Sequence, residues 1–260
     1  MTEIKEMKEI KEAKKLAFFL PNIFTALNIA CGFTSVIYSW QGLFYQAAMI
    51  LVLGAIFDMV DGRVARMTGT QSAFGEQFDS LSDVVSFGFA PAMMVYAVFF
   101  SELGRVGLVV SFIFLLCGAL RLARFNANIG KVDPNFFQGL PIPGAAFALV
   151  GYVLMTIVFP TLRYYPLFAG IYVVVYALLM ISNIPFPSFK KSEWVKKRKK
   201  RVLAIIFLIL TLTFMYEEIM IISMISFYVI GSIAYFIYQR KHGDDVFEWE
   251  NENEKEIDEE

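Results

Sequence analysis

The sequence predicts an all-α, polytopic membrane protein with about eight transmembrane helices. Hydrophobic residues make up 57% of its 260 residues and charged residues only 18%, against roughly 45–50% and 25% in soluble domains. The mean hydropathy is +0.58. Long apolar runs recur along the chain, and a helix that spans a bilayer needs about 20 such residues.

Eight apolar runs are the predicted membrane spans, and polar or charged segments separate them. They cover residues 18–39, 43–66, 77–100, 106–127, 144–160, 164–183, 202–216 and 218–238. The charged stretch before the first run, residues 1–17, has Ile4, Met7 and Ile10 at helical spacing. This pattern predicts an amphipathic helix that lies at the membrane surface.

Lysine and arginine are distributed unevenly between the segments that join the predicted spans. With the N-terminus in the cytoplasm, 21 of the 23 basic residues lie inside, and only Arg105 and Arg163 lie outside. Because cytoplasmic loops carry the excess of basic residues, both termini are predicted to be cytoplasmic. Eight of the bases lie between Lys190 and Arg201, where a cytoplasmic loop would contact anionic lipid headgroups. No nucleic-acid partner is expected, since this run lies between two spans.

The scarce residue types exclude several mechanisms. His242, the single histidine, lies beside the charged C-terminal tail. A zinc site built on histidines, a Ser-His-Asp triad and a histidine proton relay in the core are therefore excluded. Cys31 and Cys117 stand singly in apolar runs, without the spacing of a disulfide framework, and are predicted to be packing residues.

Four aspartates interrupt the second and third apolar runs. Asp58 and Asp61 are three residues apart near the end of one predicted helix, and Asp79 and Asp83 are four apart near the start of the next. Each pair therefore shares a helix face. The short connection makes the two helices antiparallel neighbours, so both pairs are expected at similar depth near the cytoplasmic surface.

Clustered carboxylates at membrane depth need a counter-charge, because each one is costly to insert. An all-oxygen site selects hard cations, namely Mg²⁺, Mn²⁺ or Ca²⁺. The alternative is a buried network of Asp–Arg pairs, but only Arg63 and Arg66 lie close in sequence, and two cations do not balance four anions. The sequence therefore predicts a divalent-metal site, with room for two ions.

Small residues flank the aspartates. Gly62 lies one turn past Asp58, and Arg66 lies one turn past Gly62, all on one helix face. Gly75 lies one turn before Asp79. A diphosphate substrate would fit these residues. The metal site and the arginine could bind its phosphates, and the glycines would let it approach the backbone closely. Taken alone, each glycine is more often a helix-packing residue.

The whole run from Asp58 to Asp83 reads DMVDGRVAR, eight further residues, and GEQFDSLSD. It resembles the signature of the CDP-alcohol phosphotransferase family, DxxDGxxAR(x8)GxxxDxxxD, and matches all eight specified positions. Members of that family are integral membrane enzymes with a six-helix core. They transfer a phosphoalcohol group from a CDP-activated donor to a hydroxyl and release CMP.

The resemblance implies a role for each matched residue. Asp58, Asp61 and Asp79 would bind metal. Asp83 would help to bind metal and act as the general base. The residues expected at the CDP-lipid are polar or small: Thr25, Asn28, Gly62, Arg66, Ser72 and Gly75. The first two of these lie in the first apolar run and could instead form hydrogen bonds between helices.

The resemblance also divides the chain, because it covers the region up to about residue 183. The predicted segments are an interfacial helix (1–17), a six-helix catalytic core (18–183), a basic cytoplasmic loop (184–201), two further transmembrane helices (202–240) and an acidic tail (241–260). Ten of the 24 acidic residues lie in Asp244–Glu260. This density of charge predicts a solvated, disordered tail.

Two further stretches narrow the acceptor. The run LRLARFN places Arg121, Arg124 and then Asn126 at the cytoplasmic end of the predicted helix 106–127. The arginines could hold a carboxylate or phosphate, or simply mark the cytoplasmic side, and Asn126 could cap the helix or bind ligand. In the next loop, FQGLPIPG, two prolines suggest a shaped loop beside the site. Both stretches resemble the serine-transferring branch, the membrane-embedded phosphatidylserine synthases, so all three side chains are expected at serine.

The predicted activity is that of a CDP-diacylglycerol–serine O-phosphatidyltransferase in the cell membrane, with its active site on the cytoplasmic side. Its substrates would be L-serine and CDP-diacylglycerol or an ether-lipid equivalent. One alternative keeps the chemistry but uses glycerol 3-phosphate or inositol phosphate as acceptor. Another is a cation-coupled transporter that uses the aspartates, for which discontinuous helices at mid-membrane would be expected. A homodimer is left open.

Overall fold

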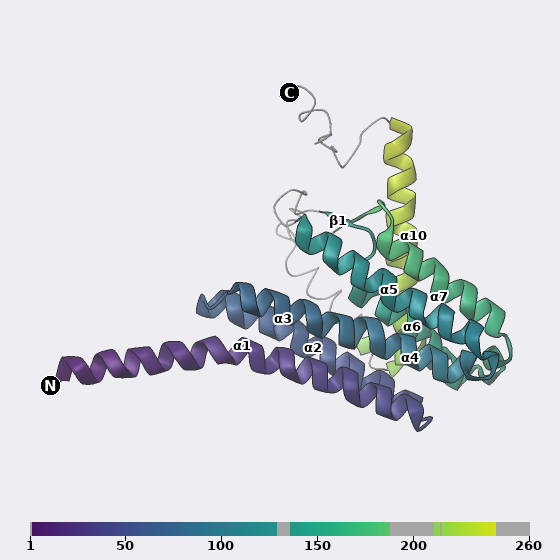
Figure 1. Ribbon diagram of the computed structural model, residues 1–260. Helices are drawn as coiled ribbons and strands as arrows, with labels where there is room; N and C mark the ends of the chain where they lie inside the picture. The colour runs from purple at the N-terminus through teal and green to yellow at the C-terminus, as the bar shows by residue number, and fades with distance from the viewer. Residues whose placement is uncertain (1, 129–135, 188–210, 214, 243–260) are drawn as a thin grey trace.

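The computed structural model in Figure 1 describes residues 2–128, 136–187, 211–213 and 215–242. This part of the chain is almost entirely helical, which confirms the all-α prediction. The helical elements are α1 (Thr2–Trp40), α2 (Phe44–Thr68), α3 (Ala73–Asp83), η1 (Val84–Phe89), α4 (Ala90–Val95), η2 (Tyr96–Phe100), η3 (Ser101–Leu103), α5 (Arg105–Ala127), α6 (Ile142–Val158), η4 (Pro160–Tyr164), α7 (Pro166–Ile181) and α10 (Glu217–His242). Two short strands, β1 (Phe136–Gln138) and β2 (Pro185–Pro187), pair antiparallel.

Several helices are long and apolar enough to cross a bilayer, as a polytopic membrane protein requires. Four stretches meet this requirement within the described residues: Phe19–Trp40, Ala73–Leu103, Arg105–Ala127 and Glu218–Lys241. The apolar helices α6 and α7 are shorter. The predicted span at 202–216 lies mostly outside the described residues. The basic run Lys190–Arg201 and nearly all of the acidic tail lie outside them as well.

The first span begins inside one continuous helix. α1 extends over 39 residues from Thr2, so the segment predicted as an interfacial helix and the span after it form one helical element. Figure 1 shows α1 extending well beyond the helices that pack on it. Pro21 lies inside α1, which packs against α2 and α3.

The turn between α2 and α3 is fixed by its own residues. Gly69 ends α2 in the left-handed region, at φ +63°, and its N–H donates to the Ala65 carbonyl. Glycine adopts this conformation without the steric cost that other residues meet. Ser72 caps the start of α3, and its Oγ accepts the Gly75 N–H at 3.1 Å. Two standard helix ends therefore hold the α2 and α3 segments that carry the four aspartates.

Serine hydroxyls join α1 to the helix that starts with α3. Ser82 Oγ donates to the Thr25 carbonyl at 3.3 Å, and Ser86 Oγ donates to the Asn28 carbonyl at 2.9 Å. The backbones are close here, because a Cβ at Gly32 would lie 2.6 Å from Ser86 Oγ. Small residues that allow helices to approach are typical of packing within membranes. These contacts set the depth of α3 relative to α1.

From Ala73 to Leu103 the chain forms one helical stretch with two π-helical segments, η1 and η2. The first begins directly after Asp83 and ends just before Pro91. Proline has no N–H to donate to the preceding turn, and widened turns accommodate such defects. The continuous helix agrees with the enzyme prediction and lacks the break at mid-membrane expected of the transporter alternative.

The second half of the molecule packs around α6. Phe87, Phe114 and Met180 from three neighbouring elements are fully buried in this core. Gly151 of α6 lets α10 approach, because a Cβ there would lie 2.9 Å from the Ile222 nitrogen. Near β1 and β2, α10 contributes Tyr235, which stacks on Phe136 with ring centroids 5.9 Å apart. The β1–β2 pair thus packs against α10.

Candidate active site

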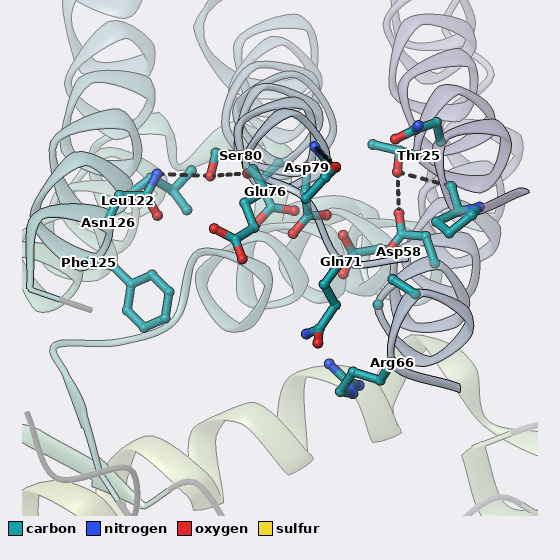
Figure 2. A pocket seen from close by; sticks show the side chains of 18 of the residues that line it. Thr25, Asp58, Arg66, Gln71, Glu76, Asp79, Ser80, Leu122, Phe125 and Asn126 are labelled. Atoms are coloured by element: carbon teal, nitrogen blue, oxygen red, sulfur yellow. Dashed lines mark hydrogen bonds between the residues drawn. The ribbon is translucent and has the colours of Figure 1, made fainter. Parts of the chain in front are cut away.

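One pocket gathers most of the predicted site residues. Its volume is about 520 Å³, and its walls come from α1, α2, the α2–α3 turn, α3, α5, β1 and the start of α6. Of the thirteen predicted site residues, all but Asn28 and Arg124 line it. Figure 2 shows Asp58 and Asp79 facing the cavity from opposite helices, with Arg66 at one end and Phe125 and Asn126 at the other.

Three carboxylates meet at the centre of this pocket. One oxygen each from Asp58, Asp61 and Asp79 lies within 4.8 Å of the others. Thr25 Oγ1 donates to Asp61 at 2.7 Å, and Asn28 Nδ2 donates to Asp58 at 3.4 Å. The Asp58 and Asp83 carboxyl groups also lie within hydrogen-bonding reach of each other. Neutral donors do not offset three negative charges, so the cluster fits a hard divalent cation.

Asp83 completes the group one turn deeper along the same helix. Its Oδ1 is buried without a hydrogen-bond partner among the described residues. The guanidinium of Arg121 lies close enough to interact electrostatically with this carboxylate. Buried polar atoms are normally satisfied. The unpaired Oδ1 therefore points to a missing ligand or proton at this position.

The structure gives a clearer reason than the sequence did to expect Arg121 at a ligand. Its side chain is 6% exposed and lines the pocket, yet its Nε has no hydrogen-bond partner in the described part of the chain. The Phe125 ring centroid lies 5.5 Å from the guanidinium carbon, a cation–π distance that helps to orient the side chain. An unpaired buried donor on a cation is a suitable partner for an anionic ligand group.

Arg124 does not line the pocket, whereas the sequence predicted it at serine. Its Nη1 donates to the Ile181 carbonyl at 2.8 Å and to Asn183 Oδ1 at 3.4 Å. Its Nη2 has three further acceptors at 3.1 Å, the carbonyls of Gln138, Met180 and Ser182. These acceptors occupy the guanidinium, which leaves it unsuited to bind a substrate carboxylate.

Asn28 is also placed differently from the prediction. Its side chain is fully buried and lies behind Asp58, outside the pocket lining. Thr25 does line the pocket, but its hydroxyl donates to Asp61. Both polar residues of α1 therefore contact carboxylates of the cluster. A hydrogen bond between helices was the alternative left open for them, and the structure favours it.

The residues predicted for the donor gather at the α2–α3 turn. Gly62 lies beneath the Arg66 guanidinium, since a Cβ there would be 3.5 Å from Arg66 Nη1. Ser72 and Gly75 line the same end of the pocket, where α3 begins. The first N–H groups of a helix lack partners within the helix and favour anions. This end of the pocket therefore suits phosphate groups.

The structure adds pocket residues that sequence reasoning missed. Glu76 and Ser80 line the cavity, and Figure 2 shows both beside Asp79. Asn126 Nδ2 donates to Ser80 Oγ at 2.9 Å, which joins α5 to α3 across the site. A signal was available, because positions 76, 79, 80 and 83 share one helix face by their spacing.

Comparison with known proteins decides the family. The family model described as CDP-alcohol phosphatidyltransferase matches residues 18–182. The chain belongs to this family. The match takes in α1 from residue 18 through the end of α7, so it contains every described element that lines the pocket.

Relatives of this CDP-alcohol phosphatidyltransferase chain carry names that specify the acceptor. A CDP-diacylglycerol–serine O-phosphatidyltransferase of Helicobacter pylori strain J99 is 43% identical over 193 residues, which are 74% of this chain and 80% of that protein. One of the same name from Methanocaldococcus jannaschii is 43% identical over 171 residues, 66% of this chain and 75% of the relative. An archaetidylserine synthase of Methanothermobacter thermautotrophicus is 38% identical over 178 residues, 67% and 72% of the two chains.

Proposed function

We propose that the protein transfers the phosphatidyl group of a CDP-activated lipid to the hydroxyl of L-serine and releases CMP. The observation that carries this proposal is a single pocket that holds a carboxylate cluster, Asp83 and the cation Arg121. The cluster suits a diphosphate donor with its metal, while Arg121 suits the carboxylate of an amino-acid acceptor. The serine transferases among the relatives support the same choice.

Asp58, Asp61 and Asp79 would hold a divalent cation. The Asp83 carboxylate in the same pocket would be a further ligand if a second ion binds. Such ions, when bound, neutralise the diphosphate and the charge that develops on the leaving group. The protein's own contribution is to fix the carboxylates. Thr25 and Asn28 do this for Asp61 and Asp58 from the neighbouring helix.

The donor would lie at the α2–α3 turn with its diphosphate near Arg66. Arginine presents several donors in a planar fork that matches phosphate oxygens. Gly62 leaves space beneath that side chain, and the N-terminus of α3 with Ser72 lies beside it. The acyl or ether chains of the donor would remain in the bilayer, because the pocket lies at the ends of membrane-length helices.

Asp83 is the proposed general base. The serine hydroxyl oxygen attacks the phosphorus that bears the lipid, its proton passes to the Asp83 carboxylate, and the bond between that phosphorus and the CMP oxygen breaks. A base must lie within hydrogen-bond reach of the proton that it takes. Asp83 lines the pocket next to Arg121, so a serine bound through its carboxylate would present its hydroxyl nearby.

The acceptor end of the pocket would be formed by Arg121, with Asn126 beside it. Phe137, Pro141 and Pro143 supply a mostly apolar wall at the same end. A small zwitterion needs one cationic partner for its carboxylate, and Arg121 provides it in a buried position. Glycerol 3-phosphate or inositol phosphate would place a more highly charged phosphate at the same cation, so the acceptor must be tested directly.

The experiment uses detergent-purified protein with a CDP-lipid and Mn²⁺ or Mg²⁺, and measures CMP release with and without L-serine. We expect CMP to appear only when serine is present, together with a lipid that contains serine by mass spectrometry. A transporter of cations would release no CMP. Release of CMP that depends on another acceptor would leave the chemistry in place and overturn the assignment of serine.

The two pocket arginines are expected to act on different substrates. Arg121→Ala should raise the serine KM roughly 10- to 150-fold, the effect of losing a charged hydrogen bond of about 1.5–3 kcal/mol, with little change in the KM for CDP-lipid. Arg66→Ala should do the reverse. Arg63→Ala is the matched control, since Arg63 is exposed on α2 outside the pocket. Equal effects of Arg121→Ala on both KM values would contradict the separation into donor and acceptor ends.

We further propose that the pocket faces the cytoplasm, since the uneven distribution of basic residues puts the α2–α3 turn on that side. Thr70 lies in this turn. Glu102 lies at the far end of the helical stretch Ala73–Leu103, which begins just after the turn. In intact cells, a membrane-impermeant maleimide should label Glu102→Cys, whereas Thr70→Cys should require permeabilised membranes. The inverse labelling pattern would reverse the proposed orientation.

A further inference from the structure

The guanidinium of Arg124 joins three segments that are far apart in sequence. It lies near the end of α5 and donates to carbonyls at the end of α7 and to one in β1. The last carbonyls of a helix have no partner within the helix and carry partial negative charge. Arg124 therefore caps the end of α7 with a positive charge, and the same guanidinium donates a hydrogen bond to β1.

Other hydrogen bonds continue this junction toward the pocket. The Gly139 N–H donates to the Ile184 carbonyl and the Leu140 N–H to the Leu179 carbonyl, each at 3.0 Å. Gln138 Nε2 donates to Asn183 Oδ1, also at 3.0 Å. The chain that follows β1 is thus held against the end of α7 by consecutive residues, and Arg124 lies in the middle of these contacts.

Gly139 is the residue that permits this arrangement. Its φ of +74° lies in the left-handed region, which favours glycine. A Cβ at this position would lie 2.9 Å from Arg124 Nη2 and 2.9 Å from the Ser182 carbonyl oxygen. The glycine therefore combines a required backbone conformation with the close approach of the guanidinium.

The segment held in this way forms one wall of the pocket. Phe137, Pro141 and Pro143 line the cavity, while Leu140 and Ile142 between them are fully buried in the core. The centroid of the Phe137 ring lies 6.5 Å from that of Phe125 of α5, whose ring lies against the Arg121 guanidinium. Two arginines three residues apart thus have different surroundings: Arg121 lines the cavity, and Arg124 binds the segment that forms this wall.

We propose that Arg124 is a positioning residue that sets the acceptor end of the pocket through the β1–α6 segment, without contact to substrate. This inference rests on the proposed function only in naming serine as the acceptor that binds beside this wall. The claim that Arg124 holds the β1–α6 segment in place rests on the hydrogen bonds alone and is measured separately.

Hydrogen–deuterium exchange on the full-length protein in detergent tests whether Arg124 holds the β1–α6 segment in place. Arg124→Ala should accelerate exchange of the Gly139 and Leu140 amides by at least about tenfold, since hydrogen bonds to a charged group contribute about 1.5–3 kcal/mol. Arg121→Ala should leave these amides protected as in the wild type. Unchanged protection in Arg124→Ala would overturn the proposal whichever acceptor the enzyme uses.

Steady-state kinetics test the consequence for the site. Arg124→Ala and Gly139→Ala should both lower kcat/KM for serine roughly 10- to 100-fold, the scale of a displaced site group, mainly through KM. Gly139→Ala removes no side chain that could bind serine, so its effect identifies positioning. A raised serine KM in Arg124→Ala alone, with normal exchange, would make Arg124 a direct ligand and contradict the inference.

Arg124→Lys separates positioning from a general loss of stability and remains informative if Gly139→Ala does not fold. An ammonium can donate to some of the carbonyls at the end of α7 but lacks the planar fork that reaches all of them. We expect partial recovery of both amide protection and serine KM, in step with each other. A serine KM at the wild-type value in folded Arg124→Ala would show a purely structural role and overturn the proposal.

Discussion

Replacing Asp79 with asparagine is expected to lower turnover by more than about 100-fold and to weaken divalent-metal binding in parallel. Loss of partners that only support metal ligands already costs 10- to 100-fold, and Asp79 is one of three carboxylates within 4.8 Å of one another. Chelation of the wild type should abolish activity, and added Mn²⁺ or Mg²⁺ should restore it. Binding of Mn²⁺, followed by electron paramagnetic resonance, gives the metal affinity independently of turnover.

Glu76→Gln is the matched control for Asp79→Asn. Glu76 is a pocket carboxylate on the same helix, one turn earlier, but it is not among the three clustered oxygens. We expect its replacement to leave Mn²⁺ binding close to that of the wild type. Full activity after exhaustive chelation, with metal shown to be absent, would remove the metal from the mechanism.

Asp83→Asn is expected to reduce the rate of the chemical step by about 10²–10⁴, the usual contribution of a general base. Asparagine keeps the shape of the side chain but does not accept the serine proton. Because Asp83 lies outside the closest group of three oxygens, metal binding should fall much less than in Asp79→Asn. Single-turnover kinetics with a preformed complex of enzyme, metal and CDP-lipid measure the chemical step itself.

Metal binding must be measured on the same Asp83→Asn preparation. If metal affinity and rate fall together by similar factors, Asp83 acts as a ligand and another group takes the proton. If the rate is near normal, Asp83 has neither role. The expected combination, a large loss of rate with metal largely retained, distinguishes the base from the three ligands.

The sequence predicted that the four carboxylates would lie close together, because the information for this is local. Asp58 and Asp61 on one helix, and Asp79 and Asp83 on the next, are placed by helical periodicity and one short turn. Gly69 and Ser72 then fix that turn with a left-handed residue and a cap. Within so short a segment, periodicity and turn chemistry suffice to bring α2 and α3 to one pocket.

The acceptor end could not be predicted in the same way. Arg121 and Arg124 are three residues apart on one helix, and nothing in their spacing says which of them faces the pocket. The answer depends on where the end of α7 lies, some 56 to 58 residues further along the chain. Contacts of that range leave no periodic signal, so sequence reasoning assigned the same role to both arginines.

Features that arise from packing were also absent from the predictions. The β1–β2 pair forms between residues on either side of α6 and α7, with Phe137 opposite Phe186. The π-helical segment η1, which lies between Asp83 and Pro91, was not predicted either. Asn28 resembles a ligand residue in sequence, but its full burial behind Asp58 follows from the close approach of α1 and α2 at Gly54.

The most direct test of the central claim is a competition between acceptors. Purified protein with one CDP-lipid and Mn²⁺ or Mg²⁺ receives L-serine, inositol phosphate and glycerol 3-phosphate at equal concentration, and the lipid products are quantified by mass spectrometry. The account predicts the serine-containing lipid as the main product, formed in equal amount to CMP, and a selective loss of that product in Arg121→Ala. A main product that contains inositol phosphate or glycerol 3-phosphate, or the absence of any acceptor-dependent product, would contradict it.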